Sequence, residues 1–189
     1  MIKIGILGDI GSGKSFVAKR FGYPVFNADE EVSRLYEKDK KTFNKLKKKL
    51  PKYFSIFPIK KREILHAIMD DKKNLKKIIK IVHPEVRKKM NFFLKKYKNK
   101  KIVILDIPLL LENKMNEKKN ILIFVQSREK DIFKKLKKRK NFNYQLFKKF
   151  KKIQLPLDYK KKKSHFVIKN DFKRRTVLKY IKNILREIN

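Results

Sequence analysis

The sequence predicts an α/β fold in which helices flank a parallel sheet of five strands. Short apolar runs alternate with longer helical patterns along the chain, and this alternation favours parallel strands joined by helical crossovers. Several runs are continuously apolar, which is typical of strands that are covered on both faces. A glycine-rich turn directly follows the first run and opens the first helical pattern. The predicted strands lie at residues 2–7, 24–27, 101–107, 120–126 and 165–169.

The glycine-rich turn carries the pattern G-x-x-x-x-G-K-[ST], which is filled here by Gly8, Gly13, Lys14 and Ser15. Glycines let the backbone approach an anion and direct successive N–H groups at it, and the helix start adds a partial positive charge. In this motif Lys14 contacts the β- and γ-phosphates and Ser15 binds Mg²⁺. The alternative is an ordinary glycine turn between a strand and a helix. That alternative does not explain why strand, loop and helix all fall where the motif requires them. We therefore expect a P-loop NTPase fold, a three-layer α/β sandwich.

The charge balance is extreme, since 55 lysines and arginines against 18 acidic residues give a net charge of +37. Such a field attracts polyanions in a salt-dependent way, so we expect nonspecific binding to nucleic acid. We expect no dedicated nucleic-acid partner, because the lysines follow helical patterns and the aromatic residues form no stacking motif. Compositional drift is the alternative explanation of the charge.

Several function classes are excluded by composition. The chain has no cysteine, so it forms neither disulfides nor thiolate metal sites. No apolar run reaches the roughly 18–20 residues of a membrane span. The first predicted strand starts at residue 2 and leaves no room for a signal peptide. We therefore expect a monomeric, cytoplasmic protein without a membrane partner.

The long segment between the second and third predicted strands indicates an inserted helical subdomain. Its helical patterns cover residues 29–50, 60–82 and 84–99, and Pro84 is expected just inside the start of the last helix. A second basic helical region precedes the fifth strand. We predict a nucleotide-binding core (1–29, 100–127 and 164–189), a helical substrate domain (30–99) and a lid with flanking helices (128–163).

Two carboxylates follow predicted strands, where ligands of parallel sheets bind. Asp29 can accept a proton from an attacking hydroxyl or orient Mg²⁺. An N-cap of a helix that starts at Glu30 explains it equally well. Asp106 ends an apolar run, as metal-holding aspartates of NTPases do. The following Pro108 bends the chain there and makes a structural role the alternative.

Basic side chains supply the remaining candidates. His83 precedes Pro84 and either borders a site or caps and packs a helix. His66 and His165 lie within apolar patterns and are interpreted as structural. Arg139 can bridge phosphate oxygens, although a solvated helix face is the alternative. Phosphoryl transfer is the chemistry that fits these groups best.

Together the segments resemble the dephospho-CoA kinase family along nearly the whole chain. The stretch GILGDIGSGKSFVAKRFG is similar to its phosphate loop. PVFNADEEVSRLY is similar to its strand ending in Asp-Ala-Asp, with Asn27 replacing the first acid and Asp29 keeping the second. The His-Pro pair in VHPEVRKKM and the segment PLLLE are distinctive of the family, whereas other nucleotide kinases share only the loop.

The resemblance implies that ATP phosphorylates the ribose 3′-hydroxyl of dephospho-CoA, the last step of coenzyme A synthesis. It implies catalytic roles for Asp29 as base, Lys14 as phosphate clamp and Arg139 as a lid residue, with Mg²⁺ on Ser15. The implied nucleotide-binding residues are Gly8, Gly11, Ser12, Gly13, Lys14, Ser15, Phe16 and Asn170. The implied substrate-binding residues are Asp29, His83, Arg87 and Glu112.

Besides Asn27, the chain departs from the family pattern in three places. Phe16 replaces the usual threonine, Ser164 and His165 replace Ala-Asp, and no glycine follows Asn170. We expect a backbone N–H to suffice at Phe16, whereas the other changes weaken the adenine assignment of Asn170. Another small-molecule or nucleoside monophosphate kinase, or a nucleotide-gated RNA-binding protein, remains the alternative function.

Overall fold

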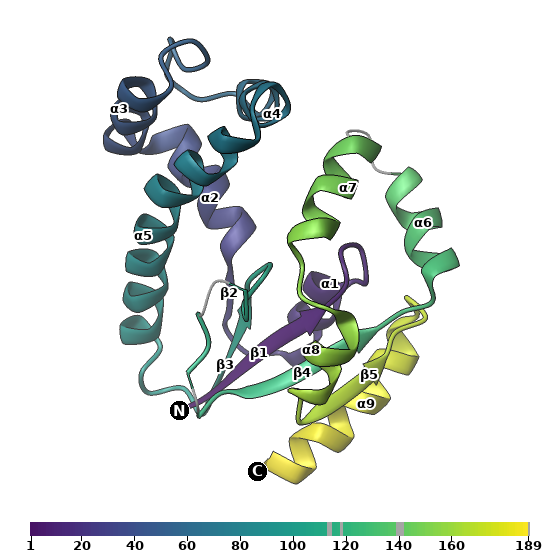
Figure 1. The fold of residues 1–189 in the computed structure, drawn as a ribbon. Helices are drawn as coiled ribbons and strands as arrows, with labels where there is room; N and C mark the ends of the chain where they lie inside the picture. Colours follow the sequence, from purple (N-terminus) through teal and green to yellow (C-terminus); the bar gives the residue numbers. More distant parts are fainter. Residues whose placement is uncertain (113–114, 118, 139–141, 189) are drawn as a thin grey trace. The chain divides into compact units, whose positions relative to one another are not determined.

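The computed structural model describes residues 1–112, 115–117, 119–138 and 142–188. Its five strands form one parallel sheet in the order β2-β3-β1-β4-β5 (Figure 1). Each predicted apolar run coincides with one of them to within one residue at each end, which confirms the fold class. Because β1 is central, the loop that follows it leaves from the middle of the sheet. The strands are β1 (Ile2–Gly8), β2 (Val25–Asn27), β3 (Ile102–Asp106), β4 (Ile121–Gln126) and β5 (Phe166–Lys169).

The helices are α1 (Lys14–Ala18), α2 (Ala28–Lys38), α3 (Lys40–Lys49), α4 (Lys61–Asp70), α5 (Lys72–Lys96), α6 (Glu129–Lys137), α7 (Tyr144–Ile153), α8 (Leu157–Lys162) and α9 (Arg174–Ile188), and the 3₁₀ turn η1 (Lys19–Phe21) extends α1. Within the described ranges, no helix combines the length and the apolar character that a membrane crossing requires.

The chain divides into two compact units. Met1–Asn27 and Tyr97–Asn189 form the first, which we call the sheet unit, and Ala28–Lys96 forms the second, which we call the helical unit. The predicted lid region, residues 128–163, belongs to the sheet unit. The division of the chain into a nucleotide-binding core, a substrate domain and a lid stays a prediction. The separate movement of the lid also stays a prediction.

The two faces of the sheet are both covered. On one face, alternate strand residues pack against α1, η1 and α9, and burial of each such side chain contributes about 1.5–3 kcal/mol. On the other, α8 contacts β1, and a Cβ at Gly5 would lie 2.6 Å from Leu110. Coverage on both faces explains why the strand sequences are continuously apolar. The first face contains Ile4, Ile6, Val17, Ala18, Phe21, Ile102, Ile104, Ile123, Val125, Ile168, Val177, Ile181 and Ile184.

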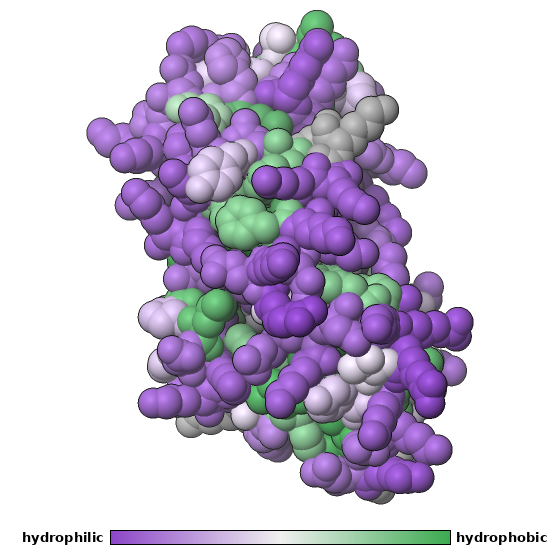
Figure 2. Space-filling view, turned by 90° about the vertical axis from the view of Figure 1, so that its right-hand side faces the viewer, coloured by the Kyte–Doolittle hydropathy of each residue, from purple (hydrophilic) through white to green (hydrophobic). Residues whose placement is uncertain are grey.

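The surface carries the excess positive charge. Figure 2 shows one face of the molecule, on which hydrophilic side chains cover most of the area and apolar residues form small, separated spots. Single exposed apolar residues of this kind are normal on soluble domains. The described lysines of the lysine-rich runs 45–52, 134–138 and 159–163 are exposed, as their helical patterns predict, with the exception of the buried Lys160.

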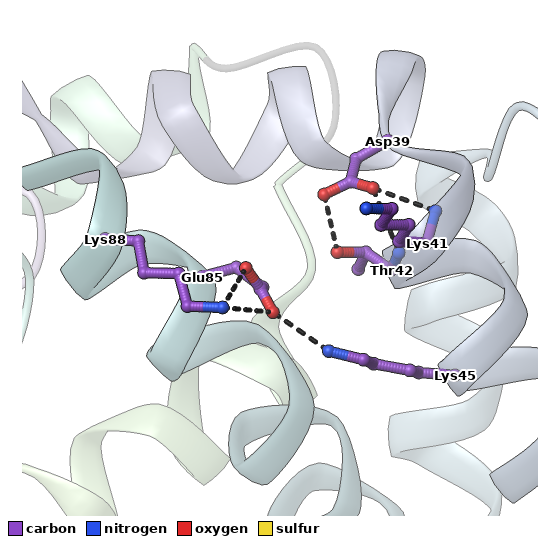
Figure 3. Close-up of polar contacts among 6 residues, drawn as sticks. All are labelled: Asp39, Lys41, Thr42, Lys45, Glu85 and Lys88. Carbon is purple, nitrogen blue, oxygen red and sulfur yellow. Dashed lines mark hydrogen bonds and ion pairs between the residues drawn. The ribbon is translucent and has the colours of Figure 1, made fainter. Parts of the chain in front are cut away.

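In the helical unit an N-cap stabilises the start of α3, and an ion pair joins α3 to α5 (Figure 3). Asp39 caps α3 by accepting hydrogen bonds from the backbone N–H groups of Lys41 (2.9 Å) and Thr42 (3.1 Å). Glu85 of α5 pairs with Lys45 of α3 at 2.9 Å and with Lys88 at 3.3 Å. The Lys45 ammonium holds the pKa of Glu85 below its ordinary value. Both lysines are exposed, so these pairs stabilise the unit modestly.

The expected helix start at Pro84 is wrong, because α5 runs through this residue without a break. Ile78, Val82, Val86 and Met90 are buried at four-residue spacing and form one apolar stripe on both sides of the proline. Proline in a helix interior removes a hydrogen bond and costs about 3 kcal/mol. Burial of the shared stripe offsets this cost and keeps the helix continuous.

We predict that Pro84→Ala stabilises the protein by about 2 kcal/mol, since the regained helical bond exceeds the entropy that alanine adds to the unfolded chain. Urea unfolding followed by circular dichroism measures the change. Pro51→Ala, an exposed turn position outside the helices, is the matched control and should give no gain. An unchanged or lower stability of Pro84→Ala would contradict the explanation.

Candidate active site

The loop between β1 and α1 has the backbone of an anion-binding loop. Gly8 (φ +145°) and Gly13 (φ +87°) take conformations that side chains rarely adopt. A Cβ would lie 2.6 Å from the Val125 carbonyl oxygen at Gly8 and 2.4 Å from Asn170 Nδ2 at Gly13. The motif therefore needs glycine at both positions for conformation and for space.

Lys14 opens α1 and folds back over the loop. Its Nζ donates to the carbonyl oxygens of Asp9 (2.8 Å) and Gly8 (3.4 Å). This position places an ammonium group at the loop, as the motif predicts. The next residue, Ser15, is exposed.

Phe16, the residue that departs from the family pattern, is covered by Arg20. The guanidinium carbon lies 3.3 Å from the centre of the Phe16 ring, and Nη1 donates to the Phe16 carbonyl at 2.7 Å. The aromatic ring also packs against the core of the sheet unit. The substitution therefore adds packing at the first turn of α1.

Asn170 supports the loop from the end of β5. Its Nδ2 donates to the Ser12 carbonyl at 2.8 Å, and its Oδ1 accepts a hydrogen bond from the Phe172 N–H at 2.9 Å. Ser127 Oγ donates to the same Ser12 carbonyl at 2.9 Å. Asn170 is 3% exposed, so its amide acts as an internal brace. The predicted contact between Asn170 and adenine stays a prediction.

The C-terminal end of α7 holds the other end of the loop. Gln154 Nε2 donates to the Gly8 carbonyl at 3.1 Å, and Lys151 forms an ion pair with the Asp9 carboxylate. Sequence reasoning missed Ser127, Lys151 and Gln154. No motif marks them, and Lys151 stands within a lysine-rich helix where nothing distinguishes it from its neighbours.

Glu112 lies in an internal ion pair of the sheet unit. Its Oε1 is 2.5 Å from Lys160 Nζ and accepts the Leu155 N–H at 3.0 Å. The side chains of Glu112 and Lys160 are only 7% and 2% exposed. Removing one partner of such a pair leaves a buried charge without compensation. The segment after β3 is thus tied to α8, and the substrate contact of Glu112 stays a prediction.

Asp106 ends β3 and His165 directly precedes β5, and both side chains have hydrogen-bond partners. Asp106 is buried at the end of β3, and its Oδ2 accepts a hydrogen bond from Asn27 Nδ2 at 3.2 Å. His165 Nδ1 accepts the Leu122 N–H at 3.0 Å, and the His165 N–H donates to the Leu122 carbonyl at 2.8 Å. The structural interpretation of His165 is confirmed.

Gly11 also lies in the phosphate loop, with φ +83°. Asp29, His83 and Arg87 belong to the helical unit, and Arg139 lies outside the described residues. Asp29 is exposed in the first turn of α2. Because α2 begins at Ala28, the alternative that Asp29 is an N-cap is wrong. His83 and Arg87 lie one turn apart on α5 and share a face. Burial, followed by the Arg87 charge, lowers the pKa of His83, which favours a neutral imidazole.

We predict that Asn170→Asp weakens nucleotide binding at least about tenfold, because a carboxylate cannot donate to the Ser12 carbonyl and also brings a buried negative charge to the phosphate loop. Calorimetry with ATP and with inorganic tripolyphosphate measures this. A loop brace affects both ligands equally. A loss confined to ATP would show instead that Asn170 contacts the base.

Comparisons with known proteins agree with this geometry. A family model described as dephospho-CoA kinase matches residues 2–175. The dephospho-CoA kinase of Wolbachia sp. subsp. Brugia malayi is 31% identical over 191 residues, covering 98% of this chain and 97% of that protein.

Two solved structures share the fold of this chain. The structure of TT1252 from Thermus thermophilus matches with a TM-score of 0.79 and 26% identity, covering 100% of this chain and 98% of that one. Dephospho-CoA kinase from Campylobacter jejuni shares the fold with a TM-score of 0.66 at 18% identity, over 99% of this chain and 97% of that one. The chain therefore belongs to the dephospho-CoA kinase family and is a transferase that phosphorylates dephospho-CoA with ATP.

Proposed function

We propose that the chain transfers the γ-phosphoryl group of ATP to the ribose 3′-hydroxyl of dephospho-CoA, with Asp29 as the general base. The observation that carries this proposal is the braced loop Gly8–Ser15 at the carboxyl end of the central strand, with Lys14 folded over it. Within a family whose substrate is an alcohol, this loop would bind the phosphate donor, and the Asp29 carboxylate would accept the proton of the acceptor hydroxyl.

The loop would hold the nucleotide through the backbone N–H groups from Gly11 to Phe16. Lys14 Nζ would exchange its bonds to the Gly8 and Asp9 carbonyls for phosphate oxygens, which its flexible side chain allows. The ammonium then faces the charge that develops on the transferring group. Arg139 would add a second cation from the lid.

The donor set near the loop fits Mg²⁺. The Ser15 hydroxyl is exposed, and Asp106 supplies a carboxylate at the end of β3. Mg²⁺ takes oxygen ligands, usually one or two carboxylates together with phosphates and water. In the described part of the chain no group of three or more histidine, aspartate or glutamate side chains is placed to hold a metal ion. When bound, the ion neutralises phosphate charge.

Asp29 would accept the proton of the 3′-hydroxyl as that oxygen attacks the γ-phosphorus. The new bond joins the ribose oxygen to phosphorus, the bond to the β,γ-bridging oxygen breaks, and ADP leaves with the electron pair. His83, Arg87 and Glu112 would border the acceptor. Burial favours the neutral form of His83, which can accept or donate a hydrogen bond to the substrate. The positive charge for a substrate phosphate would then come from Arg87.

We further propose that the protein acts as a cytoplasmic monomer and that its net charge of +37 causes only nonspecific, salt-sensitive binding to polyanions. The distribution of hydrophilic side chains in Figure 2 supports a solvated surface.

Asp29→Asn is expected to lower kcat about 10²-fold or more while ATP affinity stays near normal, because the amide keeps the shape and loses the base. A coupled assay of ADP release with dephospho-CoA measures turnover. Glu30→Gln, which removes the neighbouring exposed carboxylate, is the control and should retain activity. Unchanged turnover in Asp29→Asn would remove Asp29 from the mechanism.

Lys14→Ala is expected to raise the KM for ATP and to lower kcat by about 10²–10³-fold, the scale of a lost electrostatic contact in the transition state. The same coupled assay at varied ATP concentration separates the two effects. Lys19→Ala, an exposed lysine just beyond α1, controls for the general loss of charge. A change in KM alone would assign Lys14 to ground-state binding only.

A further inference from the structure

The phosphate loop contains a buried carboxylate, which is an unfavourable neighbour for an anion. Asp9 is the second residue of the loop and is 8% exposed. Its charge lies in the segment that approaches the phosphates, where reduced solvation strengthens electrostatic repulsion. Unless Asp9 is neutralised, each phosphate charge on the loop is opposed by the protein.

Lys151 of α7 supplies the neutralising charge. Its Nζ pairs with Asp9 Oδ2, while Asp9 Oδ1 accepts the N–H of the next residue, Ile10, at 2.7 Å. The Lys151 side chain is 39% exposed, so its ammonium retains partial hydration. The carboxylate therefore has a partner at each oxygen, and one of these partners comes from outside the loop.

The surroundings of the pair add negative charge. Asp9 and Lys151 line a cavity of about 260 Å³, which Glu129, Asp158 and Lys161 also border. Glu129 and Asp158 carry two negative charges against the one positive charge of Lys161, so Lys151 faces carboxylates besides Asp9 at this cavity.

The same contact positions α7. None of the residues of this helix is fully buried, and Phe147 packs edge-on against Phe133 of α6 with ring centres 5.8 Å apart. At its C-terminal end Lys151 reaches Asp9, and Gln154 reaches the adjacent Gly8 carbonyl at 3.1 Å. Two consecutive loop residues thus fix the end of the helix that follows the predicted lid arginine.

We propose that Lys151 is a positioning residue for nucleotide binding, which neutralises Asp9 and sets α7 against the phosphate loop. This inference rests on the proposed function only in that the loop binds the phosphates of ATP. It requires no contact between Lys151 and the nucleotide. The defect caused by loss of Lys151 must therefore depend on the presence of the Asp9 carboxylate.

A double-mutant cycle tests this dependence. Calorimetry at one fixed salt concentration measures Kd for ATP and for inorganic tripolyphosphate in the wild type, Lys151→Met, Asp9→Asn and the double variant. Lys151→Met should weaken both ligands about tenfold, and Asp9→Asn should bind them at least as tightly as the wild type. The double variant should return to within about threefold of Asp9→Asn.

Control variants distinguish the loss of the Lys151 charge from a general loss of positive charge and from misfolding. Lys152→Met removes an exposed lysine at the next position and should leave Kd unchanged. Lys151→Arg keeps the charge and should bind near the wild-type level. Circular dichroism and urea unfolding report whether each variant folds. If Lys151→Met fails to fold, Asp9→Asn still tests the inference. Weaker ligand binding by Asp9→Asn than by the wild type would contradict repulsion between Asp9 and the phosphates.

Three results overturn the inference. Wild-type affinity in Lys151→Met shows that the pair does not matter for binding. A defect of equal size with and without Asp9 shows that Lys151 acts on the phosphates directly. Weaker binding in Asp9→Asn shows that the carboxylate helps the loop. A wild-type protein that binds neither ligand would refute the proposed function itself, which is a distinguishable outcome.

Discussion

The structure depends on one constraint, which is that a short loop must keep its N–H groups directed at an anion. The loop cannot do this alone, because its glycines allow many conformations. Bonds from outside fix it at both ends, with Asn170 and Ser127 on the Ser12 carbonyl and Gln154 on the Gly8 carbonyl. The central position of β1 makes these braces possible, since β4 and β5 end beside the loop.

The sequence was informative about the fold because the relevant signals are local. Strands covered on both faces must be continuously apolar, and the runs at residues 102–106 and 121–126 are easily recognised. Two local rules failed where neighbours decided the outcome. Pro84 starts no helix because the buried stripe of α5 continues past it, and Asp29 is no cap because α2 begins at Ala28.

The site was only partly predictable for a related reason. The residues that contact phosphate are consecutive, so their spacing forms a motif. The residues that hold the loop are distant in sequence and have ordinary neighbours. Gln154 and Lys151 contact a loop more than a hundred positions away, and lysine is too common in this chain to stand out. Contacts of this kind follow from the fold and not from a pattern.

The two units provide different residues for the proposed reaction. The sheet unit contains the braced loop and its cations, and the helical unit contains Asp29, His83 and Arg87. Phosphoryl transfer needs little covalent chemistry from the protein, so catalysis depends on how well donor and acceptor are positioned. In the proposed reaction, the contacts that brace the phosphate loop would serve this positioning.

A crystal structure with ADP and dephospho-CoA bound together would test the central claim most directly. The account predicts the β-phosphate within the Gly8–Ser15 loop and the Asp29 carboxylate at hydrogen-bond distance, roughly 2.6–3.2 Å, from the ribose 3′-hydroxyl. An Asp29 side chain directed into solvent, with another group on that hydroxyl, would contradict it.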